Sequence, residues 1–155
     1  MRDGGRLSAA IEILTDVETR HRPVKLALKA WGDASRFAGS KDRAWVSGLV
    51  LDVLRRRRSL AWRMGDDSPR AAVFCALHAL WNWPVERIAE AAADAPRGPG
   101  AVSEAERVAL MQPRDMAEAP PSIRGDYPEW LQPSLARAFG HEAALEGAML
   151  SERAP

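Results

Sequence analysis

Apolar residues along most of this chain recur at steps of three and four, and no segment alternates in the manner of a half-buried strand. The first such series contains Leu7, Ala10, Ile11, Leu14 and Val17. This spacing places one apolar stripe on a helix. The segment RAAVFCALHALW, residues 70–81, is apolar nearly all round, which is typical of a helix at the centre of a domain. The sequence therefore predicts an all-α fold.

Local start and stop signals divide the chain into helices. Ser40 is expected to cap a helix that carries Asp42 in its first turn and extends towards Leu60 and Ala61. The pair Ser68–Pro69 starts the central helix, and Ser103 with Glu106 fits a capping box. We expect further helices over residues 6–19, 23–32, 84–94 and within 127–155. The predicted organisation is a helical bundle over residues 1–110, a Pro-rich linker over 111–126 and an appended helical segment over 127–155.

Charge is distributed unevenly along the sequence. The formal net charge is only +1, yet residues 1–63 hold 14 Lys+Arg against 7 Asp+Glu, whereas residues 64–155 hold 8 against 14. The first part is therefore net +7 and the second net −6. Such asymmetry is a hint of a nucleic-acid or other anionic partner.

Four consecutive arginines, residues 55–58, follow an apolar helical segment. Because each helical residue advances about 100°, these side chains cannot share one face. Arg57 falls in phase with the apolar stripe, so either the helix bends there or the guanidinium emerges at the rim. One interpretation is a solvated helix end whose cations complement the helix dipole. The other is a phosphate-binding surface, because arginine offers fork-shaped donors to phosphate oxygens.

Motifs for other chemistries are missing from the sequence. There is no G-x-G-x-x-G, P-loop, G-x-S-x-G or H-E-x-x-H. The single cysteine, Cys75, forms no internal disulfide and, with His78, is expected to be inert core. Most tryptophans lie on or beside apolar stripes, so we expect core or rim positions and see no stacking platform for bases. No signal peptide or membrane-length apolar run is present, and we expect a soluble cytoplasmic protein without a metal site.

Three stretches in order resemble a known family. They are RLSAAIEIL from Arg6, SKDRAWVSGLVLDVLRRRRSLAW from Ser40 with its Asp42-Arg43-Ala44 motif, and ALHALWNWP from Ala76. Together with YPEWLQPSLARAFG, residues 127–140, they resemble the NusB-like RNA-binding domain at the front of Sun/Fmu-type bacterial 16S rRNA (cytosine-5) methyltransferases. The segment GPGAVSEAERVALMQPRDMAEAPP departs from this pattern, because the family has an Asn-bearing closing helix there.

The resemblance implies a helical module that positions 16S rRNA while a methyltransferase domain transfers a methyl group from S-adenosylmethionine to C5 of a cytosine. The cofactor loop and the two catalytic cysteines of the family have no matching positions here, and the chain is expected to be the front part of a longer enzyme. No catalytic, cofactor-binding or metal-binding residue is therefore assigned. The predicted RNA-binding residues are Arg43, Arg55, Arg56 and Arg58, supported by Arg6, Arg36, Lys41 and Arg63.

Two alternatives remain open from the sequence. NusB-like domains also make protein contacts in transcription antitermination complexes or form dimers, so the chain can instead be a protein-interaction or homodimerisation module. In the other alternative, the chain packs only against its own methyltransferase domain and binds nothing else.

Overall fold

A computed structural model describes residues 1–155, and every regular element in it is a helix, which confirms the predicted all-α class. The bundle consists of α1 (Asp3–Arg20), α2 (Val24–Ala34), α3 (Ser40–Arg55), α4 (Arg57–Met64), α5 (Pro69–Ala79), α6 (Val85–Ala92) and α7 (Glu104–Met111). A C-terminal unit follows, with α8 (Pro121–Arg124), α9 (Gln132–Phe139), α10 (Ala143–Leu150) and the 3₁₀ turns η1 (Met116–Glu118), η2 (Glu129–Leu131) and η3 (Gly140–Glu142).

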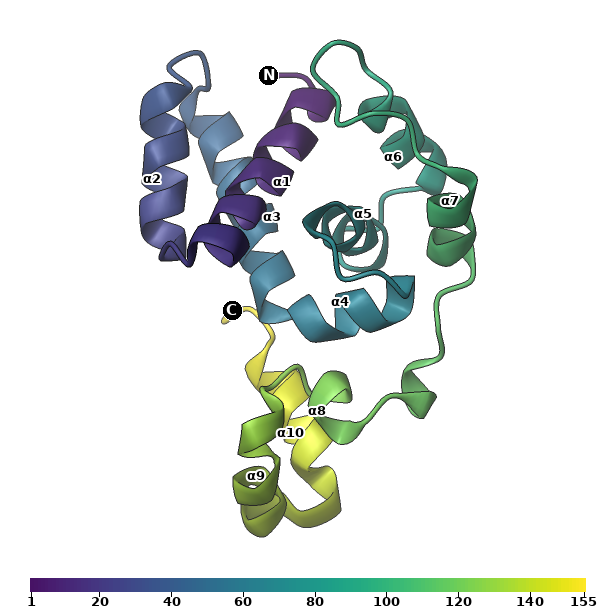
Figure 1. Ribbon diagram of the computed structural model, residues 1–155. Helices are drawn as coiled ribbons and strands as arrows, with labels where there is room; N and C mark the ends of the chain where they lie inside the picture. Colours follow the sequence, from purple (N-terminus) through teal and green to yellow (C-terminus); the bar gives the residue numbers. More distant parts are fainter.

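Helix α5 is the centre of the bundle, as its composition predicts. Every residue from Ala71 to Leu77 is buried. Figure 1 shows α5 end-on, surrounded by α1, α3, α4, α6 and α7, and all five contact it. Helix α7 packs on α4, α5 and α6 through buried Leu110 and so closes the ring of helices in the segment that departs from the family pattern.

Several predicted helix ends are confirmed by their hydrogen bonds. The Ser68 hydroxyl accepts from the amide of Ala71, and Ser103 and Glu106 form the reciprocal capping box. The prediction that Ser40 caps α3 is wrong. The cap residue is Gly39, whose amide donates to the carboxylate of Asp42 at 3.3 Å.

The expected continuous helix towards Ala61 is interrupted at Arg56. This residue leaves helical geometry (φ −124°, ψ 24°), so α3 ends at Arg55 and α4 begins at Arg57. At Arg57 the sequence left open a bend of the helix or a guanidinium at the rim of the core, and the structure has the bend. The new direction lets Arg57 pair with Glu18 of α1 and turns α4 across α5, where Leu60 is buried.

The C-terminal unit is built on a close approach of α8 and α10. A Cβ atom at Gly147 would lie 2.6 Å from the carbonyl oxygen of Gly125 and 2.6 Å from the ring of Tyr127, so only glycine fits there. The unit is tied to the bundle at the bend between α3 and α4. Asp126 binds Ser59, the Arg58 guanidinium donates to the Tyr127 carbonyl, and the chain returns to α3 at its end (Figure 1).

The predicted linker, residues 111–126, contains η1 and α8 and lies along α4. The Arg114 amide donates to the Arg63 carbonyl, and the Trp62 indole donates to the Asp115 carbonyl at 3.1 Å. These contacts fix the path of the chain between α7 and the C-terminal unit.

Candidate nucleic-acid interface

The eight predicted RNA-binding residues fall into two groups at opposite ends of α3. This helix has 16 residues and is therefore about 24 Å long. The corner group lies at the α3–α4 bend and along α4: Arg55, Arg56, Arg58 and Arg63. The loop group lies at the start of α3 and around the α2–α3 loop: Arg6, Arg36, Lys41 and Arg43. The structure therefore does not bring the eight residues together on one surface.

Two of the four members of the corner group have partners inside the molecule. Arg55 pairs with Asp52 at 3.2 Å, and Arg58 donates to the Tyr127 carbonyl at 2.8 Å. Arg56 is partly buried and lines a pocket with Asp52 and the chain end around Arg153. Only Arg58 bonds directly to the C-terminal unit, whereas the Arg55 pair lies within α3. Arg56 and Arg63 are half-buried and form no ion pair, so the corner group presents less accessible charge than its sequence suggests.

Asp52 is the centre of this ion-pair network. Its carboxylate accepts from Arg153 at 2.6 and 2.7 Å and from the Trp81 indole at 2.9 Å. Burial opposes ionisation of Asp52, but the hydrogen bonds from Arg153 and Trp81 outweigh it and hold its pKa below the ordinary value. The carboxylate is therefore ionised at neutral pH and neutralises the cations around it.

Two members of the loop group are also committed to the fold. Arg6 donates to Asp42 at 2.7 Å, and the terminal ammonium of Met1 binds the same carboxylate at 3.1 Å. The hydrogen bond from Arg6 lowers the pKa of Asp42. Arg43 donates to the carbonyl of Ala38 at 3.0 Å and so holds the α2–α3 loop against the first turn of α3. These contacts fix the position of the loop.

Arg36 and Lys41 are different, because both are exposed and neither forms an ion pair. Two further cations lie at the same end of the molecule. Arg2 has a side chain 82% exposed, with a single 3.4 Å contact to Asp94, and Arg97 is exposed and also has no ion pair. We call these four residues the upper cations: Arg2, Arg36, Lys41 and Arg97. They lie at the start of α1, in the α2–α3 loop, in the first turn of α3 and in the α6–α7 loop, all at the top of Figure 1.

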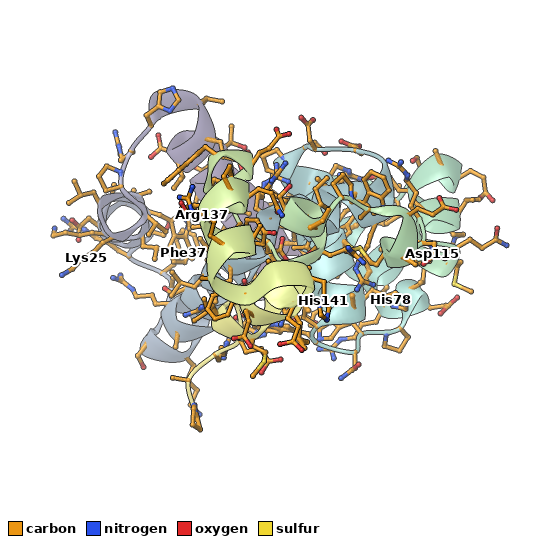
Figure 2. The ribbon with its side chains drawn as sticks, turned by 90° about the horizontal axis from the view of Figure 1, so that it is seen from below. Lys25, Phe37, His78, Asp115, Arg137 and His141 are labelled. Atoms are coloured by element: carbon orange, nitrogen blue, oxygen red, sulfur yellow. The ribbon has the colours of Figure 1, made fainter.

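Sequence reasoning missed Arg97 as a site residue and Phe37 beside it. The guanidinium of Arg97 lies 5.7 Å from the Phe37 ring centroid, and Phe37 is 64% exposed. In the sequence, Arg97 is part of a Pro- and Gly-rich break, and nothing local indicates that this break folds back to the α2–α3 loop. Lys25, also exposed, projects outward from the start of α2 (Figure 2) and is not part of this surface.

The cysteine and one histidine both lie on the central helix α5. Cys75 is buried, and burial raises the pKa of its thiol to about 11. The His78 Nδ1 atom lies 2.8 Å from the Trp83 carbonyl, which accounts for its position on α5. No group of three His, Cys, Asp or Glu side chains is arranged to hold a metal ion. None of the helices combines the length and the apolar character that a bilayer crossing requires.

Comparisons with protein-family models, with curated proteins and with solved structures found no match to this chain. The resemblance to the NusB-like domain therefore remains a prediction from the quoted motifs, and the candidate interface depends on its own geometry.

Proposed function

We propose that this chain is the RNA-positioning module of an S-adenosylmethionine-dependent 16S rRNA (cytosine-5) methyltransferase. In this proposal the cofactor and the catalytic cysteines belong to a methyltransferase domain, and the helices contribute placement of the RNA. Two lines support it: the resemblance of the quoted motifs, and the gathering of the upper cations at one end of the bundle. The second observation carries the proposal, because Asp42, Asp3 and Asp33 nearby are already paired with other cations.

Three acidic residues at this end have partners outside the upper cations, whereas Asp94 pairs with Arg2. Asp42 binds Arg6 and the amino terminus, Asp3 binds Arg6 and Arg87, and Asp33 binds Lys29. The upper cations therefore face solvent with little opposing charge. Such cations contact phosphate oxygens. These contacts fix the position of an RNA without reading its sequence.

The salt dependence of RNA binding tests the proposal. If the four upper cations each neutralise one phosphate, the slope of log K against log salt is about −3. The test variant combines Arg36→Ala, Lys41→Ala and Arg97→Ala. The matched control combines Lys25→Ala, Arg124→Ala and Arg137→Ala, which removes the same charge from exposed positions elsewhere. Binding of 16S rRNA fragments is measured at about 50 mM and 200 mM salt.

The test variant is expected to lose most of the salt slope and the control to keep it. Equal slopes for the two variants would show that the upper cations have no special role. Wild-type protein that binds no fragment, even at low salt, would end the RNA proposal.

A second candidate function is protein interaction, favoured by apolar side chains left exposed on the C-terminal unit. Trp130 is 75% exposed and Leu150 78% exposed. Leu145 and Met149 are one helical turn apart on α10, so they share one exposed face, and Phe139 is also exposed. Exposed apolar patches mark contact sites for proteins. The occupant can be a second copy of the chain or the methyltransferase domain.

Light scattering over a range of concentrations distinguishes the two functions. A mass that rises with concentration, is unchanged by salt and is lost in Leu145→Glu would support self-association through α10. A constant monomer mass would leave RNA positioning as the better account of the isolated chain.

A further inference from the structure

A pocket of about 420 Å³ opens beside two of the upper cations, Arg2 and Arg97. It is lined by Met1, Arg2 and Gly5 at the start of α1, by Phe37 of the α2–α3 loop and by residues 94–97 of the α6–α7 loop. Its volume lies within the range of about 300–1,000 Å³ that is usual for small-ligand sites. Three segments distant in sequence form it, so the pocket exists only in the folded bundle.

Phe37 gives this pocket an aromatic wall. Phe37 is 64% exposed, and the cation near its ring is Arg97. The loop that carries Phe37 is held by the Arg43 contact to Ala38 and by the Ala38 amide, which donates to the Ser35 carbonyl. The ring is therefore presented from a fixed loop.

The charges around the pocket favour an anionic ligand. Arg2 and Arg97 line it, and Arg36 precedes Phe37 in the loop. Asp94 is the one carboxylate in the lining, and it faces Arg2 at 3.4 Å. A planar group attached to a phosphate chain matches an aromatic wall between arginines, because every base has a π-face that can stack on such a ring.

We propose that this pocket receives one unstacked base of an RNA strand, with Phe37 stacking on the base and Arg97 and Arg2 contacting the adjoining phosphates. The inference rests on the proposed RNA function and adds to it a preference for unpaired over double-stranded RNA. A base held in a duplex is already stacked and cannot enter the pocket, whereas unpaired bases in loops and ends can.

The test compares Phe37→Ala and Phe37→Trp with wild type on two RNA probes, a single-stranded oligouridylate and an RNA duplex of the same length. Trp130→Ala serves as the matched control, because it removes a similarly exposed aromatic side chain from the other end of the molecule. Because Phe37 is exposed, its truncation leaves the buried core unchanged. Fluorescence anisotropy gives the dissociation constants at low salt.

Phe37→Ala is expected to bind the single strand about 5- to 10-fold more weakly, near the lower end of measured losses for base–aromatic stacking. Duplex binding is expected to stay within about twofold, Phe37→Trp to retain the single-strand affinity, and Trp130→Ala to behave as wild type. If wild type binds with a full salt slope but Phe37→Ala equals it on both probes, the pocket inference is wrong and the proposed function stands.

Equal losses on the duplex and the single strand would also refute base stacking. An acidic peptide that competes with RNA and shows the same dependence on Phe37 would assign the pocket to a protein ligand instead. Wild-type protein that binds neither RNA probe would refute the proposed function itself.

Discussion

The N-terminus of α4 is capped by a side chain from far along the chain. Arg56, at the cap position, provides no side-chain acceptor. The Asp126 carboxylate instead accepts from the Ser59 amide at 2.8 Å and from the Ser59 hydroxyl at 2.6 Å, across 67 residues of sequence. One residue therefore satisfies the helix end and fastens the C-terminal unit to the bundle.

The expected cost of Asp126→Ala follows from three effects. Loss of an N-cap acceptor costs about 0.5–2 kcal/mol, and a partly buried donor left without a partner costs about 1–3 kcal/mol, with some overlap between the two. Asp126 also has φ 54°, where alanine adds about 1 kcal/mol of strain. We expect Asp126→Ala to lower the free energy of unfolding by about 2–4 kcal/mol.

Asp126→Asn is the matched control. Asparagine keeps an acceptor oxygen for the Ser59 amide and tolerates left-handed backbone geometry. Burial raises the pKa of Asp126, which means that its charge at neutral pH is held at a cost, and the amide removes that cost. The carboxyl's own contribution is largest below its unfolded pKa and falls as pH rises through the folded pKa. Asp126→Asn is therefore expected to stay within about 1 kcal/mol of wild type at pH 7.

Urea unfolding measures both variants, and limited proteolysis reports release of the C-terminal unit. A loss of 2–4 kcal/mol corresponds to a fall in Tm of about 5–15 °C for a chain of this size. Cleavage is expected to increase in residues 111–126 for the alanine variant only. A double-mutant cycle with Ser59→Ala should show a coupling energy above about 0.5 kcal/mol. Equal stability of wild type and Asp126→Ala would refute the capping argument.

Three further predictions concern the bundle. Two adjacent glycines of α1 should respond to alanine with opposite signs in thermal unfolding. Gly4→Ala should destabilise the fold, because its Cβ would lie 2.6 Å from a backbone carbonyl oxygen of α6. Gly5→Ala should raise the free energy of unfolding by about 0.5–1 kcal/mol, because its Cβ would lie 3.4 Å from the flexible side chain of Met1. Arg70→Lys should cost about 2–3 kcal/mol in urea unfolding, because Arg70 binds Glu106 and three carbonyls of the α6–α7 loop through a fork that lysine lacks. Acidification below about pH 4 should lower the urea midpoint. The reason is that hydrogen bonds, despite burial, hold the pKa values of Asp52 and Glu106 below their unfolded values. Asp52→Asn should make the urea midpoint less dependent on pH, and an unchanged pH dependence in this variant would contradict the explanation.

Features encoded over a few residues could be predicted well. The Ser68 cap, the Ser103–Glu106 capping box and the apolar helix from Ala71 to Leu77 all follow from neighbours in the sequence. Side-chain oxygens three residues from an amide and apolar residues at helical spacing act locally, so these signals remain readable without the fold.

The break at Arg56 could not be located in the same way. The stripe from α3 continues in phase through the arginines, so local propensity favours one long helix. The bend is stabilised by packing of α4 on α5, by the Arg57–Glu18 pair and by Asp126, all of which involve distant residues. Tertiary contacts therefore override the local preference.

The sequence by itself determined the helical class, the central helix and the excess of positive charge in residues 1–63. Only the tertiary structure decided which of those cations are free. It placed the Tyr127 carbonyl against Arg58 and Asp42 against Arg6, and it left Arg36 and Lys41 exposed without an ion pair. The physical reason is that helix formation depends on residues three or four apart, whereas the neutralisation of a charge depends on whichever group the fold brings within a few ångströms.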